Sequence, residues 1–218
     1  MNIIQKLKYD AEFKTDLLLG FFIASLILAN LLGSKITTIL GVRVSVGIFF
    51  VPVLFLVTDI ITEVHGKSRA KNFFYISISV LLFALAMMYL CIIMPAHEKW
   101  LNQEAYEMIF KGSIRMTIAS LIAFILSQYH DIWAFHFWKK KTKGKFLWLR
   151  NNASTIVSQF IDTTVFMYIA FYHLTPKFTT SFILTLIIPY WVFKIVFALL
   201  DTPLCYLGVK WLKSKQTK

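Results

Sequence analysis

The sequence predicts an all-α polytopic membrane protein with six transmembrane helices, organised as a single domain over residues 1–218. Three observations predict this class. Of the 218 residues, 58% are hydrophobic and 17% aromatic, with a mean hydropathy of +0.67, which is more apolar surface than a water-soluble domain of this size can bury. The apolar residues gather in six long runs. The basic residues concentrate in alternate connections between those runs.

The six runs have about the length that a bilayer requires, roughly 17–25 residues. Val46–Ile61 is the marginal one, and it reaches spanning length if it extends to Gly66. In the last run, Pro203 removes a backbone hydrogen bond and is expected to kink the helix. The predicted spans are Leu17–Leu32, Val46–Ile61, Phe73–Met94, Ile114–Phe137, Ser154–His173 and Thr180–Leu207.

Two connections have patterns of their own. Between the first two runs, β-branched residues lie between Gly33 and Val46, with Gly41 among them. This pattern predicts a short extended hairpin or a re-entrant turn, which a membrane tolerates only where protein or water satisfies its backbone. The segment 95–112 contains three glutamates, and we expect it to form a short interfacial helix.

The basic residues are distributed unevenly about the membrane. Sixteen lysines and arginines fall on one predicted side and six on the other, while Lys194 lies within the last run. The positive-inside rule therefore places both termini in the cytoplasm, in agreement with an even number of spans. The formal charge of +12 thus indicates topology rather than nucleic-acid binding. The basic side holds Lys6, Lys8, Lys14, Lys67, Arg69, Lys71, Lys139, Lys140, Lys141, Lys143, Lys145, Arg150, Lys210, Lys213, Lys215 and Lys218.

The sequence lacks the motifs of nucleotide-binding proteins, metalloproteins and enzymes. Cys91 and Cys205 lie in apolar runs and are read as buried free thiols. Gly66-Lys67-Ser68 resembles the end of a phosphate-binding loop, but Ile61 stands where its first glycine belongs. No nucleophile–base set and no metal spacing emerges, so we expect neither an enzyme nor a cofactor. The histidines, including His130 and His136, are read as interfacial or packing residues.

Six ionisable side chains lie in or at the edges of the apolar runs. One charged residue at mid-bilayer costs about 2.5–3.5 kcal/mol, and a buried charge needs a partner or water. Several such residues predict a polar cavity within a helix bundle, which is typical of a transporter. They are Asp59, Glu63, Asp131, Asp162, Lys194 and Asp201.

Polar residues recur at helical spacing in the fourth and fifth runs. Ser154, Ser158 and Asp162 follow one another every four residues and share a helix face, with Gln159 beside them. The pattern S-Q-x-x-D-x-x-x-F occurs at Ser127 and again at Ser158. In antiparallel spans the two copies would face each other as an inverted repeat. Chance and shared helix-packing needs remain alternatives, because small polar residues also serve helix packing.

The remaining charged residues have two interpretations each. Asp59 and Glu63 lie four residues apart and form either interfacial acids solvated at the headgroups or a carboxylate pair at the inner mouth of a cavity. Lys194 lies too deep in its run to reach the interface easily. Its favoured counter-ion is Asp162, and that pair is either structural or part of a binding site.

Taken in order, these motifs resemble the queuosine-precursor transporters of bacteria, six-helix proteins of the vitamin-uptake type. The resemblance runs from Asn30 to Pro203. His65 stands where the family often has tyrosine, and members vary at the position of Glu63. The motifs are Ala29-Asn30, Thr58-Asp59-Ile60 through Glu63 and Gly66, Arg115 before Ala119-Ser120, Ser127-Gln128-x-x-Asp131, Leu147 through Ser154, Ser158-Gln159-x-x-Asp162, Lys194 and Asp201-Thr202-Pro203.

The resemblance implies import of 7-deazaguanines across the bacterial inner membrane, feeding queuosine modification of tRNA. A carboxylate would accept hydrogen bonds from the guanine-like edge, and Phe166 or Trp191 would stack on the ring. The alternatives are a substrate-binding subunit of an energy-coupling-factor vitamin importer and a non-transporting membrane scaffold. The expected partners are a small molecule and the lipid bilayer, with a homodimer left open. The predicted substrate-binding residues are Asn30, Asp59, Glu63, Arg115, Gln128, Asp131, Ser158, Gln159, Asp162, Lys194 and Asp201.

Overall fold

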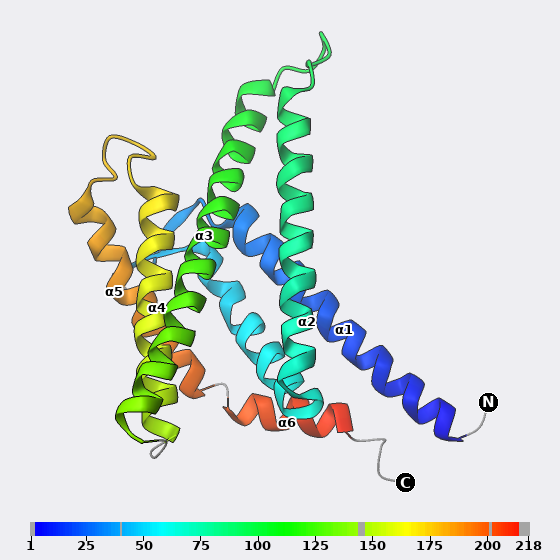
Figure 1. Ribbon diagram of the computed structural model, residues 1–218. Coiled ribbons are helices and arrows are strands. Elements are labelled where there is room, and N and C mark those ends of the chain that lie inside the picture. The colour runs from blue at the N-terminus through cyan, green and yellow to red at the C-terminus, as the bar shows by residue number, and fades with distance from the viewer. Residues whose placement is uncertain (1–2, 40, 144–146, 201, 214–218) are drawn as a thin grey trace.

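The computed structural model describes the backbone of residues 3–39, 41–143, 147–200 and 202–213, and their side chains except at 3–9, 67, 128, 131, 132, 135, 136, 139, 147–155, 198, 199 and 202. The fold is a bundle of long helices with one small hairpin (Figure 1). The elements are α1 (Ile3–Leu32), β1 (Ile36–Ile39), β2 (Val42–Ser45), the 3-10 helix η1 (Val46–Phe50), α2 (Val51–Ile93), α3 (Gln103–Lys141), α4 (Leu147–Phe171), α5 (Thr180–Leu200) and α6 (Thr202–Lys213).

Helix α2 consists of two arms that reverse direction at Gly66. In Figure 1 the first arm descends from the hairpin, turns at the lower end of the bundle and returns as the second arm. Gly66 has φ 80° and ψ 170°, a conformation open essentially to glycine alone. The two arms supply the candidate spans Val46–Gly66 and Ser68–Ile93. One glycine thus makes the turn, and residues 67–72, expected to be a loop, belong mostly to the second arm.

The predicted hairpin between the first two spans is confirmed. Strands β1 and β2 pair antiparallel, with Ile36 opposite Ser45 and Ile39 opposite Val42. Ser45 then caps η1, since its hydroxyl donates to the Gly33 carbonyl at 2.6 Å and accepts from the Gly47 amide at 3.1 Å. The strand pairing and this cap satisfy backbone groups that would be costly next to lipid.

Five helical segments among the described residues are long and apolar enough to cross a bilayer, two of them in α2, and α4 adds the shorter apolar stretch Ile156–Phe171. The predicted interfacial helix in 95–112 is wrong, because α3 begins at Gln103 and continues without a break to Lys141. The predicted sixth span is also wrong at its end. Helix α5 stops at Leu200, and Pro203 lies in the first turn of the separate helix α6, where its missing N–H is not needed.

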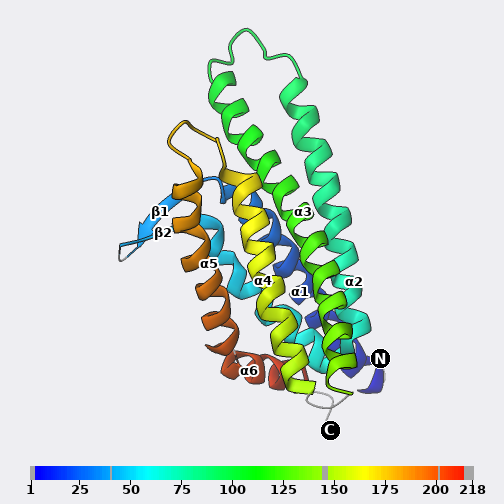
Figure 2. The same ribbon diagram turned by 60° about the vertical axis from the view of Figure 1, so that its left-hand side comes forward.

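The helices pack in two groups. Helices α3 and α4 lie side by side, with α5 against α4, and this group shares a core with β2 and η1 that includes Met116, Met167 and Ile187. A second core joins α1, α2 and α6 around Ile61 and Leu212. The start of α1, the Gly66 turn, the α3–α4 ends and α6 all lie at the same end of the bundle (Figures 1 and 2). These segments carry most of the basic residues that the sequence placed on one side.

Candidate functional site

An ion pair within the bundle joins α4 to α5. Lys194 Nζ lies 2.7 Å from Asp162 Oδ2, and the two side chains are only 10% and 22% exposed. The predicted pairing of Lys194 with Asp162 is therefore confirmed. At this depth each charge depends on the other, because removing one partner of a buried pair leaves an uncompensated charge.

The second oxygen of Asp162 is less well satisfied. Ser127 Oγ on α3 lies 3.5 Å from Asp162 Oδ1, but it also lies 3.0 Å from the carbonyl of Phe124. A serine hydroxyl has one proton to donate, and the shorter bond to Phe124 is the better one. Asp162 Oδ1 thus retains the capacity to accept a stronger hydrogen bond from another donor.

A second polar contact between α3 and α4 lies one helical turn away. Ser158 is buried, and its Oγ lies 3.0 Å from Nδ1 of His130. Sequence reasoning assigned His130 to packing or the interface. The signal that could have found it is its spacing, since His130 follows Ser127 by three residues and so lies on the same face of α3.

Gln159 contributes an acceptor with no partner. Among the described residues, Gln159 Oε1 is buried without a hydrogen bond, and the same holds for Thr163 Oγ1 and Thr164 Oγ1. Gln159 and Thr163 lie four residues apart on α4, on the side next to Asp162. Buried polar groups in native proteins are nearly always hydrogen-bonded, so this side of α4 is suited to a ligand that brings donors.

The aromatic side chains near the ion pair differ in burial and in the contacts that they make. Tyr190, one turn before Lys194, is buried, and Lys194 Nζ lies 5.6 Å from its ring centre. Phe166 lies one turn after Asp162 and packs against the core of the α3–α5 group. Trp191 donates to the Ile156 carbonyl at 3.2 Å and meets Phe160 edge-on, so it already serves the α4–α5 contact.

Arg115 lies apart from the ion pair. Its Nε donates to the carbonyl of Ile169 at 2.6 Å, and a terminal nitrogen donates to the carbonyl of Tyr172. These carbonyls mark the C-terminal end of α4, where helices leave acceptors unsatisfied and favour a cation. Asp162 is seven residues from Ile169, about 10 Å of helix rise. Arg115 therefore joins α3 to the end of α4.

The remaining predicted residues are spread over the bundle. Asn30 is buried in α1 and donates to the Leu26 carbonyl at 2.8 Å. Asp59 and Glu63 are exposed on the first arm of α2, whose Ile60 and Ile61 are buried against α1 and α6. Gln128 and Asp131 belong to α3, but their side chains, like all of Asp201, lie outside the described residues. The structure thus brings together Ser158, Gln159, Asp162 and Lys194.

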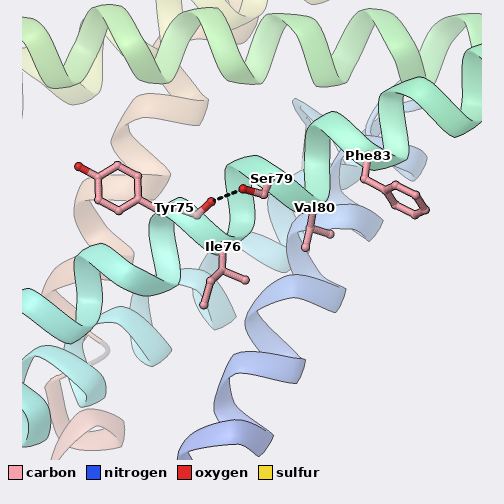
Figure 3. A pocket seen from close by; sticks show the side chains of 5 residues that line it. All are labelled: Tyr75, Ile76, Ser79, Val80 and Phe83. Atoms are coloured by element: carbon pink, nitrogen blue, oxygen red, sulfur yellow. Dashed lines mark hydrogen bonds between the residues drawn. The ribbon is translucent and has the colours of Figure 1, made fainter.

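A hollow of about 410 Å³ lies elsewhere, on the second arm of α2. Figure 3 shows its lining, which is mainly aliphatic and aromatic, with the Ser79 hydroxyl turned back to the Tyr75 carbonyl at 3.0 Å. Tyr75 and Phe83 are more than half exposed. Such a groove fits acyl chains better than a polar solute. No group of His, Cys, Asp or Glu among the described residues could hold a metal ion.

Comparisons with known proteins agree with this membrane-spanning architecture. Residues 45–208 match a family model described as "Putative vitamin uptake transporter". The chain is 29% identical over 183 residues to the "Probable queuosine precursor transporter" of Bacillus subtilis (strain 168), covering 84% of this chain and 79% of that protein. It is 25% identical over 200 residues to the "Queuosine precursor transporter" of Escherichia coli (strain K12), covering 91% and 86%. No solved structure matches it significantly.

The family model covers about three quarters of the chain, including every residue of the polar cluster around Asp162. The relatives are named as transporters and not as enzymes. The resemblance drawn from the motifs is therefore confirmed. This chain belongs to the vitamin uptake transporter family, as a multi-pass membrane transporter rather than an enzyme.

Proposed function

We propose that this chain imports queuosine precursors and binds them at the polar cluster around Asp162 and Lys194. The substrates would be 7-deazaguanines, namely the 7-cyano and 7-aminomethyl bases or queuine, which then feed queuosine modification of tRNA. The main observation in support is the ion pair of Lys194 with Asp162 inside the bundle. The second carboxylate oxygen of Asp162 has only a 3.5 Å contact with Ser127. The names of the two relatives support the substrate class.

The chemistry of the cluster suits a ring rich in N–H donors. A guanine-like edge offers a ring N–H and an amino group side by side, and Asp162 Oδ1 and Gln159 Oε1 are acceptors with capacity to spare. We expect Phe166, one turn along α4, to stack on the face of the ring. Analogues without these donors would leave the acceptors buried and unpaired, so they would be rejected.

The ion pair also offers a way to couple binding to movement. Lys194 neutralises Asp162 and holds α5 to α4. A ligand that donates to the same carboxylate competes with Lys194 and loosens this link. In one state Lys194 satisfies Asp162, and in the other the ligand does. Because the ligand binds only the second state, it can shift the equilibrium between the two.

We further propose six crossings in a single domain over residues 1–218, in the bacterial inner membrane with both termini in the cytoplasm. The start of α1 and helix α6 lie at the same end of the bundle (Figures 1 and 2), which requires an even number of crossings between them. That end carries the basic segments, as the positive-inside rule requires of the cytoplasmic side. The short apolar stretch of α4 would be the remaining crossing.

The test is uptake by a host that cannot make queuosine and is supplied with a 7-deazaguanine. Expression of this chain is expected to restore queuosine in tRNA, and Asp162→Asn to abolish the restoration. The matched control is Glu107→Gln, which disturbs an exposed ion pair with Lys111 on α3 and should leave uptake intact. If the Asp162 variant supports full uptake, the site is wrong.

Purified protein separates the alternatives. An energy-coupling-factor subunit needs a partner scaffold and ATPases, so liposomes containing this chain alone would take up no precursor. A non-transporting scaffold would show neither uptake nor thermal stabilisation by 7-deazaguanines. We expect both uptake and stabilisation from this chain alone.

A further inference from the structure

Helix α6 presents three sides of different chemistry. Cys205, Val209 and Leu212 recur at helical spacing and pack into the core shared with α1 and α2. The contact is close at Gly208, where an added Cβ would lie 2.2 Å from Ile60 Cδ1. This side fixes α6 across the end of the bundle (Figures 1 and 2).

The second side is apolar and exposed. Leu204, Leu207 and Trp211 follow one another at i, i+3 and i+7, and they are 48%, 64% and 41% exposed. The third side is basic. Tyr206, Lys210 and Lys213 recur at i, i+4 and i+7, and all three are exposed.

Helix α6 is also tied to α1. Lys14 Nζ donates to the carbonyl of Trp211 at 2.7 Å and lies 5.1 Å from the centre of the Trp211 ring. This bond satisfies one of the acceptors left open at the end of α6. The helix is therefore held along its length, with its apolar and basic sides both directed away from the protein core.

We infer that α6 is an in-plane membrane anchor that binds anionic phospholipid headgroups. A helix with one apolar and one basic side lies in the interface, with its apolar residues among the acyl chains and its lysines at the headgroups. Tryptophan and tyrosine are enriched at the same depth. The charge of Lys210 and Lys213 selects anionic over zwitterionic lipid. This inference does not depend on the identity of the transported substrate.

The test uses the purified full-length chain in detergent, titrated with lipids brominated on their acyl chains, which quench nearby tryptophan fluorescence. We expect phosphatidylglycerol to quench at a lower lipid fraction than phosphatidylcholine. The chain has six tryptophans, so the difference in quenching between the wild type and Trp211→Phe gives the contribution of α6. The quenching that Trp211 contributes should be absent from the variant.

The headgroup is tested by Lys210→Gln with Lys213→Gln. This double variant should need roughly thirtyfold more phosphatidylglycerol for half-maximal quenching, with its phosphatidylcholine curve unchanged. The matched control is Lys99→Gln with Lys177→Gln, two exposed lysines at the other end of the bundle, which should behave as wild type.

Three results would overturn the inference. The first is equal quenching by the two lipids in the wild type, and the second is a wild-type curve for the Lys210/Lys213 variant. The third is loss of the lipid preference on adding millimolar inorganic phosphate at constant ionic strength, which would indicate a site for a free anion. Retention of the preference under that condition supports a lipid surface.

Discussion

Lys194 and Asp162 meet at 2.7 Å between Nζ and Oδ2, and this contact links α5 to α4 inside the bundle. Ser127 of α3 reaches the other carboxylate oxygen only at 3.5 Å. Three helices therefore meet at one carboxylate whose hydrogen-bonding capacity is only partly used.

Removing one charge of this pair is expected to destabilise the protein more than removing both. Lys194→Met alone leaves Asp162, whose side chain is 22% exposed, without its cation, a loss of up to about 3–5 kcal/mol, seen as a lower thermal midpoint in detergent. Adding Asp162→Leu should restore most of the stability, because an apolar pair of similar volume is often neutral or better. Precursor uptake should stay lost in both variants.

The matched control for that series is the exposed pair of Glu107 and Lys111, at 2.6 Å on α3. Exposed pairs at this helical spacing contribute only about 0.3–0.5 kcal/mol, so Lys111→Met should barely move the midpoint. Additive losses in the Lys194/Asp162 double variant would contradict a coupled buried pair.

Gln159→Leu is expected to separate binding from stability. Because Gln159 Oε1 accepts no hydrogen bond from the described residues, the substitution removes an unpaired buried acceptor and should hold or raise the thermal midpoint. A lost ligand bond of about 1 kcal/mol should lower the apparent affinity for the precursor severalfold. Thr164→Val, at another buried unpaired oxygen of α4 but on a different face from Asp162, serves as the control and should keep wild-type affinity.

Arg115 is expected to act on the fold rather than on the substrate. Its two hydrogen bonds to the carbonyls of Ile169 and Tyr172 close the end of α4. Arg115→Met should therefore cost about 1–3 kcal/mol of stability, measured by thermal unfolding. The precursor concentration for half-maximal uptake should stay unchanged in the protein that folds. A large rise in that concentration would indicate that Arg115 binds the substrate.

Gly66→Ala is expected to weaken the reversal of α2. At φ 80° and ψ 170° an alanine is strained by about 1–3 kcal/mol, although an added Cβ would meet no atom within 4 Å. Gly20→Ala is the control, since Gly20 lies within α1, also in open space, and alanine there should stabilise the helix by about 0.5–1 kcal/mol. Equal effects of the two substitutions on the thermal midpoint would contradict the strain.

The amino-acid sequence alone determined the parts of this protein that follow from local solvent preference. Apolar runs of spanning length predicted the long helices, and β-branched residues between glycines predicted the β1–β2 hairpin. The partner of Lys194 was also predictable, because a lysine deep in an apolar run needs a carboxylate at the same depth, and few were available.

Only the tertiary structure decided features that depend on how helices rotate and end against their neighbours. The exposed, glutamate-containing start of α3 looks interfacial in sequence, yet it continues the helix. Helix α5 ends at Leu200, and α6 follows as a separate helix whose core-facing side (Cys205, Val209 and Leu212) packs with Ile60 and Leu18. The spacing from Ser127 puts His130 on the polar face of α3, but its contact with Ser158 depends on how α3 and α4 rotate against each other. The contact of Arg115 with the end of α4 depends likewise on the positions of backbone carbonyls.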